Sequence, residues 1–155
     1  MRTIRLIALA ASLLGVPELS LAADPTPWPQ WRGPSRDGQV QGETWPDRLD
    51  KAALEKLWRV PLDPSYSGPI VSGDLVFTTE TKNKESEVAV ALDRKTGKER
   101  WRTEWKGAMT VPFFAASNGS WIRATPAYDS GCLYVAGMRD ELEIGRASCR
   151  ERVWR

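Results

Sequence analysis

The sequence contains no histidine and only two cysteines among its 155 residues. The absence of histidine removes the usual general base near neutral pH, the commonest metal ligand and any haem-binding Cys-x-x-Cys-His motif. A glycine-rich phosphate loop and a clustered pair of carboxylates are also missing, and nucleotide-binding proteins and hydrolases depend on such groups. We therefore identify no catalytic residue and no metal ligand in the sequence, and we assign no cofactor-binding residue.

No apolar run reaches the roughly 20 residues that a membrane-spanning helix needs. The most prominent run lies near the N-terminus, where two arginines within the first five residues precede the uncharged stretch 6–16. Pro17 interrupts this stretch, and Ser20-Leu21-Ala22 places small residues where a signal peptidase cleaves. Residues 1–22 are therefore predicted to be a signal peptide rather than a buried N-terminal helix. The mature chain is expected to be periplasmic or extracellular, without a transmembrane segment.

The C-terminal residues 144–155 show neither the alternation of a strand nor the residues of a turn. Residues 144–153 resemble, position by position, the translation of a common sequencing adapter, so 144–155 are interpreted as a non-native tail. Without this tail and the signal peptide, residues 23–143 carry a net charge of −2, whereas the whole chain carries +2. A nucleic-acid partner is therefore not expected, since nucleic-acid-binding proteins present basic surfaces.

The two cysteines do not predict a disulfide. Cys149 falls in the C-terminal tail, which leaves Cys132 alone. Cys132 begins a run that is typical of a strand, and a free cysteine in that setting is usually a small buried side chain. We expect no native disulfide in this chain.

Residues 23–56 are rich in proline, glycine, tryptophan and charge, without a sustained period. This composition predicts an irregular lead-in. Its three tryptophans are expected to lie against the body of the domain, because exposed indoles would leave large apolar areas in water. They are Trp28, Trp31 and Trp45. Residues 57–62 then alternate apolar and other residues, which predicts an outer strand that closes a sheet.

Residues 68–105 contain four short apolar runs joined by turn residues, and this pattern is typical of a four-stranded antiparallel meander. The pattern restarts in 124–143, with Pro126 placed 57 residues after Pro69. A repeat of this kind predicts an all-β fold made of propeller blades. The chain would then hold about one and a half blades, with residues 57–62 as a closing strand.

The most specific motif is Ala91-Leu92-Asp93-Arg94-Lys95-Thr96-Gly97-Lys98-Glu99-Arg100-Trp101. Asp93 can accept hydrogen bonds from the backbone of the turn that follows it, and Thr96 lies within that turn. Gly97 can adopt the positive φ that closes a bulged hairpin. Trp101 can pack its ring against a neighbouring blade. We therefore assign Asp93, Thr96, Gly97 and Trp101 as a structural motif rather than a catalytic site.

This motif resembles the A-x-D-x-x-T-G-x-x-x-W signature of PQQ-like, or quinoprotein-type, propeller repeats. Residues 28–38 resemble the W-P-Q-W-R-G-P-x-R-D-G lead-in of a group of exported bacterial PQQ-like propeller proteins, and Tyr66-Ser67-Gly68-Pro69 resembles the opening of their first blade. The resemblance covers roughly residues 28–140. It implies a propeller whose ends are sealed by N-terminal residues.

Two functional classes are compatible with this resemblance. The first is a non-catalytic propeller that binds protein or envelope partners as a scaffold and holds no cofactor in this chain. The second is a PQQ-dependent alcohol or sugar dehydrogenase, in which Ca²⁺ polarises the quinone. Such dehydrogenases often carry a vicinal cysteine pair early in the ring, and this sequence has none. The sequence therefore favours a binding protein over an enzyme.

Overall fold

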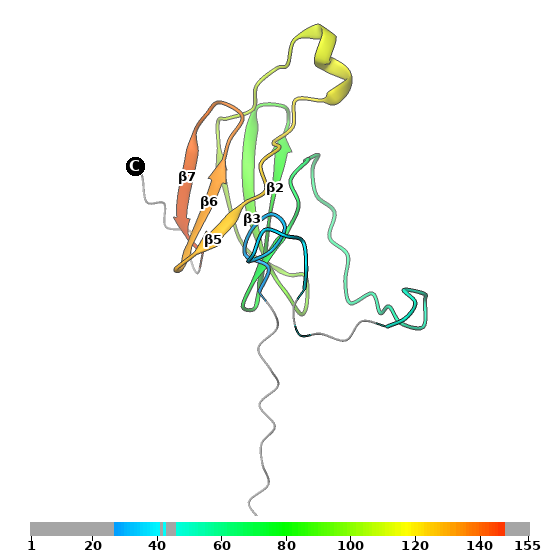
Figure 1. Cartoon of the computed structure of the whole chain (residues 1–155). Helices are drawn as coiled ribbons and strands as arrows, with labels where there is room; N and C mark the ends of the chain where they lie inside the picture. The colour runs from blue at the N-terminus through cyan, green and yellow to red at the C-terminus, as the bar shows by residue number, and fades with distance from the viewer. Residues whose placement is uncertain (1–26, 41, 43–45, 148–155) are drawn as a thin grey trace, which may run out of the picture.

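The computed structural model describes residues 27–40, 42 and 46–147, and this part of the chain is built from two antiparallel sheets without an α-helix (Figure 1). The first sheet consists of β1 (Ile70–Ser72), β2 (Leu75–Lys82), β3 (Ser86–Asp93) and β4 (Glu99–Trp105). The second consists of β5 (Ala127–Asp129), β6 (Cys132–Ala136) and β7 (Leu142–Arg146). A short 3-10 helix, η1 (Phe113–Asn118), lies in the connection between the sheets.

The strands of each sheet follow one another in sequence order, so both sheets are meanders. Local turn chemistry explains this order. Asp129 pairs with Cys132 across a two-residue loop, Ser130-Gly131, in which both residues have positive φ. Two-residue hairpins of the favoured type need that conformation at both positions. The predicted all-β fold is confirmed, as one four-stranded sheet followed by three strands of a second.

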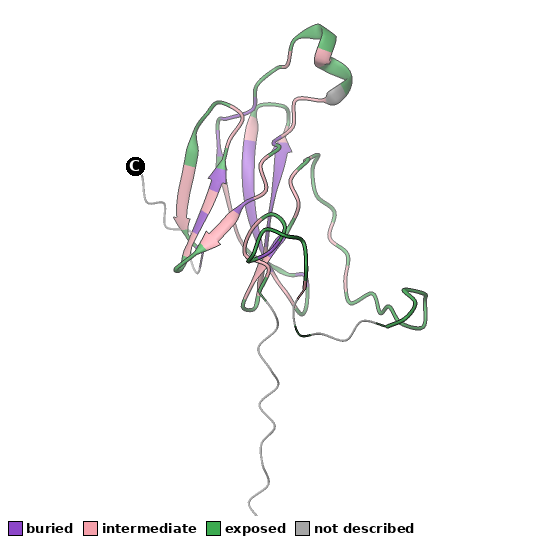
Figure 2. Ribbon diagram, viewed as in Figure 1, coloured by how far each residue is buried: buried purple, intermediate pink, exposed green. Residues whose placement is uncertain are grey.

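Strand β3 is the centre of the first sheet and is buried on both faces (Figure 2). Because side chains alternate along a strand, Ala89 and Ala91 point toward the second sheet, and Val88, Val90 and Leu92 point the opposite way. The cluster between the sheets combines residues of both sheets and of the connection: Ile70, Phe77, Ala89, Ala91, Trp105, Ile122, Leu133, Val135 and Ala147. The two sheets are therefore held together by one shared apolar core.

Residues 57–62 are predicted to be an outer strand that completes the last blade of the ring, and the described strands do not include that blade, so the closing role stays a prediction. These residues form no ladder. Trp58 and Val60 instead pack on the face of the first sheet formed by β3, against Val88, Val90 and Leu92. A segment that crosses a sheet face cannot pair with it, because backbone donors and acceptors are available only at the strand edges.

The second sheet extends past residue 144, where the non-native tail is predicted to begin, and the interpretation of 144–155 as non-native stays a prediction. Strand β7 extends to Arg146, pairing Ile144 with Tyr134 and Gly145 with Leu133. Ala147 follows as a buried residue. Ladder hydrogen bonds join backbone groups, so this pairing does not need the alternation that the sequence lacks there. The rest of the predicted tail, and the predicted signal peptide 1–22, lie outside the described residues.

The lead-in binds both sheets. Trp28 forms an antiparallel bridge with Val71 of β1, through a 2.7 Å bond from its N–H and a 2.8 Å bond to its carbonyl. The next carbonyl, that of Pro29, accepts a 2.7 Å bond from the backbone N–H of Tyr128 in β5. Trp31 contradicts the expectation for the lead-in tryptophans, because its side chain is 65% exposed. Trp45 lies outside the described residues.

A buried carboxylate, Glu87, joins the sheets at one end of the core. Its side chain is fully buried and accepts a 3.0 Å hydrogen bond from Trp105 Nε1 and a 2.9 Å bond from the backbone N–H of Met138. Two glycines make room for it, since a Cβ at Gly107 or Gly137 would lie 2.5 or 2.6 Å from Glu87 Oε2. The alternation along β3 places Glu87 on the same face as Ala89, a signal that sequence reasoning did not use.

Burial raises the pKa of the Glu87 carboxyl above its usual 4.5, although the bonds from Met138 and Trp105 oppose this shift. A raised folded pKa means that the folded state binds the proton more tightly than the unfolded state. The stability that this group contributes is therefore complete below pH 4.5 and is lost as the pH rises through the folded pKa.

Replacing Glu87 by alanine should destabilise the chain because it leaves two buried donors, Trp105 Nε1 and the Met138 N–H, without an acceptor. Each unsatisfied buried donor costs about 1–3 kcal/mol. The matched control is Glu85→Ala, two residues away and exposed, for which a change within about 0.5 kcal/mol is expected. Chemical denaturation of both variants measures the difference. Equal stabilities would show that Glu87 does not hold the sheets together.

Candidate functional site

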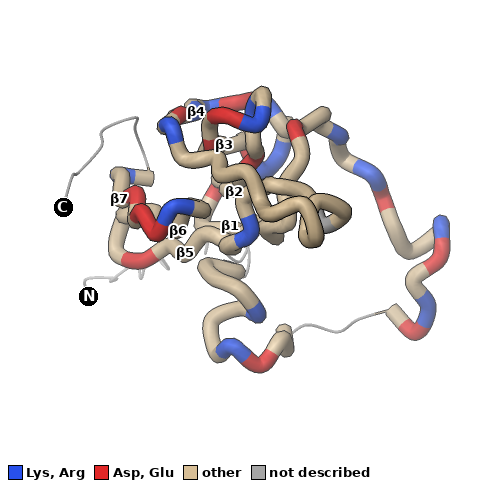
Figure 3. Tube along the Cα trace, turned by 90° about the horizontal axis from the view of Figure 1, so that it is seen from above, with Lys and Arg blue, Asp and Glu red and all other residues tan. Residues whose placement is uncertain are grey.

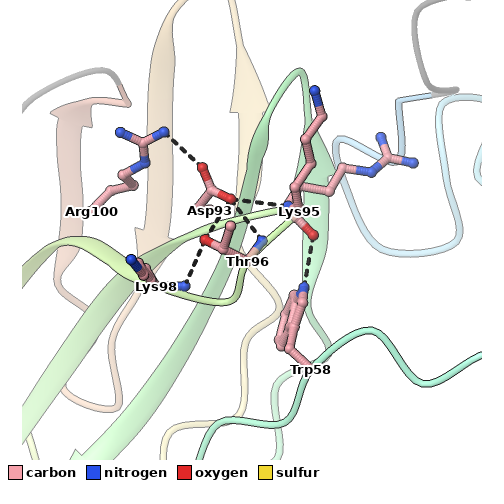
Figure 4. Close-up of polar contacts among 7 residues, drawn as sticks. Trp58, Asp93, Lys95, Thr96, Lys98 and Arg100 are labelled. Atoms are coloured by element: carbon pink, nitrogen blue, oxygen red, sulfur yellow. Dashed lines mark hydrogen bonds and ion pairs between the residues drawn. The ribbon is translucent and has the colours of Figure 1, made fainter.

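The four motif residues lie around the β3–β4 turn and on the strand that follows it. In the turn, Asp93 Oδ1 accepts hydrogen bonds from Thr96 N (2.8 Å), Thr96 Oγ1 (2.8 Å) and Lys95 N (3.1 Å) (Figure 4). Its other oxygen accepts a 2.7 Å bond from Arg100, which also makes an ion pair. A single carboxylate therefore organises both the turn and the start of β4.

These contacts lower the pKa of Asp93 to about 2 from its usual 3.8. The hydrogen bond from the Thr96 hydroxyl is the largest cause, followed by the bonds from Arg100 and from the Thr96 N–H. Each donor stabilises the ionised carboxylate relative to the neutral acid. Asp93 is consequently a poor proton donor or acceptor near neutral pH, in keeping with an architectural role.

Gly97 closes the turn and receives the ring of Trp58. Its φ is +70°, and its N–H donates a 2.8 Å bond to the carbonyl of Asp93. A Cβ at this position would lie 2.7 Å from the indole of Trp58. The indole also donates from Nε1 to the carbonyl of Arg94, at 2.8 Å. Sequence reasoning placed Trp58 in a strand and missed this contact with the motif.

Trp101 joins the first sheet to the second. Its ring lies 6.0 Å from the ring of Phe77, which in turn stacks on Tyr128 of β5. Its Nε1 donates a 2.9 Å bond to the carbonyl of Ala147, just after β7. Trp101 thus lies apart from the Asp93 turn and acts at the contact between the sheets. Ala147 lies in the predicted tail, so this bond could not be predicted from the sequence.

The face of the first sheet that points away from the second sheet carries another carboxylate held by hydrogen bonds, Glu80, and a shallow pocket. Glu80 is almost fully buried, and it accepts bonds from Arg102 (2.7 Å) and from the backbone N–H of Asp63 (2.9 Å). The pocket beside it has a volume of about 380 Å³. Its lining mixes apolar side chains with hydroxyls: Trp58, Leu62, Asp63, Ser65, Ser67, Pro69, Val76, Thr78, Thr79 and Leu92. Several hydroxyls bond one another, since Ser65 contacts both Ser67 and Thr79.

A family model described as the outer membrane protein assembly factor BamB, of the PQQ-like repeat class, matches residues 47–137 and 84–155. Together these matches span 47–155, well over half of the chain. The chain belongs to this family. No match is found among the curated proteins or among the solved structures.

The two matches to the PQQ-like repeat overlap over residues 84–137, so both contain the Asp93 motif. The four-stranded sheet and the three strands after it are accordingly part of a PQQ-repeat propeller. In a propeller each blade buries its faces against its neighbours. The contacts of Trp101 and Glu87 are contacts of this kind.

The described residues contain no cluster of acidic, histidine or cysteine side chains that could hold a metal ion. Calcium, for example, is held by six to eight oxygen ligands. Within the part of the chain that the structure describes, no helix is long and apolar enough to cross a bilayer.

The low pKa of Asp93 predicts acid-dependent stability. A depressed folded pKa contributes stability that is present above the unfolded pKa and is lost as the pH falls through the folded one. Asp93 should therefore lose its contribution between pH 3.8 and about 2. Thermal midpoints measured across this range should fall less steeply for Asp93→Asn than for the unmodified chain. Thr96→Val, which removes the largest cause, should lie between them. Identical slopes in all three proteins would contradict the assignment.

Replacing Gly97 by alanine should destabilise the chain for two reasons. A left-handed backbone costs an alanine about 1–2 kcal/mol, and displacing the Trp58 ring adds about 1–3 kcal/mol. Gly73→Ala is the matched control, because Gly73 has φ +54° and no atom within 4 Å of the added Cβ. Urea unfolding of both variants separates the two costs. A loss no larger for Gly97→Ala than for Gly73→Ala would rule out the Trp58 contact as a stabilising interaction.

Proposed function

We propose that this chain is part of an exported, non-catalytic propeller that binds protein or other envelope partners as a scaffold. The family to which it belongs is described as an outer membrane assembly factor, and a protein of that kind works through surfaces rather than through a reaction. The signal-peptide pattern in residues 1–22 supports delivery to the periplasm or the cell exterior.

The proposal rests on one observation: the buried and half-buried carboxylates are hydrogen-bonded to other groups of the protein itself. Glu87 accepts bonds from Trp105 and Met138, Glu80 binds Arg102, and Asp93 is saturated by its own turn. A catalytic acid or base must instead point at the space that a substrate occupies. In this chain Glu87 and Glu80 each join two segments of the fold, and Asp93 holds one turn in place, which is the expected use in a scaffold.

The alternative function is a PQQ-dependent dehydrogenase of alcohols or sugars. It requires Ca²⁺ ligands, a stacking platform for the quinone and a base near the reacting carbon. The described residues do not form that ligand set, so this alternative would place the site in other blades of the ring.

Thermal unfolding with added PQQ and Ca²⁺ distinguishes the two functions. A ligand present at 100 times its Kd stabilises a protein by about 2.7 kcal/mol. The test needs the complete propeller that contains this chain, because the alternative places the cofactor site in other blades. That propeller is expected to show no change in Tm with PQQ and Ca²⁺, together or separately. A rise in Tm that requires both, accompanied by dye reduction with an alcohol or a sugar, would establish the dehydrogenase instead.

Export is tested on the same protein, expressed with a C-terminal tag in a Gram-negative host. The expected product is a periplasmic or secreted chain whose first residue is Ala23. Leu13→Arg places a charge inside the apolar stretch and should leave the chain uncleaved in the cytoplasm. Cytoplasmic, full-length protein from the unmodified sequence would overturn the export part of the proposal.

A further inference from the structure

The connection between β4 and β5, residues 106–126, exposes an aromatic pair at its tip. We call this connection the aromatic loop. It extends beyond the ends of the strands and carries η1 at its outermost point (Figure 1). Phe113 is 92% exposed and Phe114 is 76% exposed, with their rings edge to face at 5.7 Å. Large apolar side chains grouped in this way mark an interaction surface.

The base of the aromatic loop is anchored to the first sheet. The N–H of Ile122 donates a 2.8 Å bond to the Thr81 hydroxyl, and the carbonyl of Ile122 accepts a 2.9 Å bond from Tyr66 N. On the other side, Ala108 N donates to the carbonyl of Glu85 at 3.2 Å. The two phenylalanines are therefore presented from a fixed base, away from the apolar core between the sheets.

The charges of the aromatic loop are of one sign. From residue 106 to residue 128 the sequence has no acidic residue and two basic ones, Lys106 and Arg123. Seen from above, the loop is largely an uncharged stretch lying over the strands (Figure 3). Lys84 of the neighbouring turn lines a pocket of about 300 Å³ together with residues of the loop itself. The acidic residue of that turn, Glu85, offsets one of these cations.

This arrangement matches the interface of an anionic membrane. The apolar groups lie outermost on a convex tip, and the cations are set back toward the base. Peripheral proteins use the same order, with aromatic side chains at the acyl boundary and Lys or Arg among the headgroups. The pocket of about 300 Å³ at this loop is lined by neither Phe113 nor Phe114, so a peptide held in it would leave the aromatic pair exposed.

We propose that the aromatic loop docks on the surface of a bilayer that contains anionic phospholipid. Phe113 and Phe114 enter the acyl boundary, and Lys106 and Arg123 interact with the headgroups. The loop would hold the propeller at the membrane, a role that goes beyond scaffolding and does not depend on it. It rests on the exposure, anchoring and charge of these residues.

Co-sedimentation of the full chain with vesicles tests the proposal. The chain is expected to bind vesicles of phosphatidylethanolamine and phosphatidylglycerol more tightly than vesicles of phosphatidylcholine, and added salt should weaken the binding. Phe113→Ala and Phe114→Ala should each weaken it about tenfold, and the double variant about a hundredfold. The matched control is Trp31→Ala, because Trp31 is 65% exposed but lies in the lead-in. Binding of this control should be unchanged.

Circular dichroism and Tm establish that the variants fold, which is expected because both phenylalanines are exposed. Absence of vesicle binding by the unmodified chain, or undiminished binding by the double variant, would overturn the proposal. Equal binding to phosphatidylcholine would overturn the role of the cations. Analytical ultracentrifugation without lipid tests whether the chain self-associates. Self-association that is lost in the double variant would show that the tip binds a second copy of the chain, and this would also overturn the proposal.

Discussion

The burial of β3 on both faces is the constraint on which the rest of the structure depends. A four-stranded sheet with apolar side chains on both sides is not stable alone in water, because each exposed apolar face costs about 25 cal/mol for every square ångström. Ala89 and Ala91 are covered by the second sheet, and Val88, Val90 and Leu92 by Trp58 and Val60. Each covering segment comes from a different part of the chain, so the blade acquires its stability from its neighbours.

Hydrogen bonds between polar groups fix how the two sheets lie against each other. An apolar surface alone would let two sheets slide, whereas hydrogen bonds at fixed points set their register. Glu87 reaches Met138, Trp101 reaches Ala147, and Pro29 of the lead-in reaches Tyr128. These bonds lie at separate places along the contact between the sheets. Together they explain why carboxylates and indoles, which elsewhere serve catalysis and ligand binding, are here used for assembly.

Much of the fold could be predicted because it is encoded locally. The four strands of the first sheet lie within residues 68–105, where four apolar runs were read from the sequence, and β5 and β6 lie within the restart at 124–143. Strand β7, which runs to Arg146, was not predicted. The Asp93 turn depends on side chains within eight residues of one another, so its type and spacing sufficed. Its pattern also led to the family, which the match over residues 47–155 then established.

The contacts between distant segments could not be predicted in the same way. Trp58 has the alternating neighbours of a strand, yet it crosses a sheet face because Gly97 leaves room for its ring. Residues 144–146 lack the pattern of a strand, yet they pair with β6 through the backbone alone. The exposure of Phe113 and Phe114 likewise follows from the path of the connection, since composition does not reveal which apolar side chains remain outside a core.

The sequence by itself determined the strand order within each meander, the turns that join the strands and the identity of the motif, because these depend on residues close together in the chain. Only the tertiary structure decided which face of each strand is covered, where Glu87 finds its donors and how the lead-in binds both sheets. Those outcomes depend on the free space and the unpaired backbone groups that other segments present, and neither is encoded in local spacing.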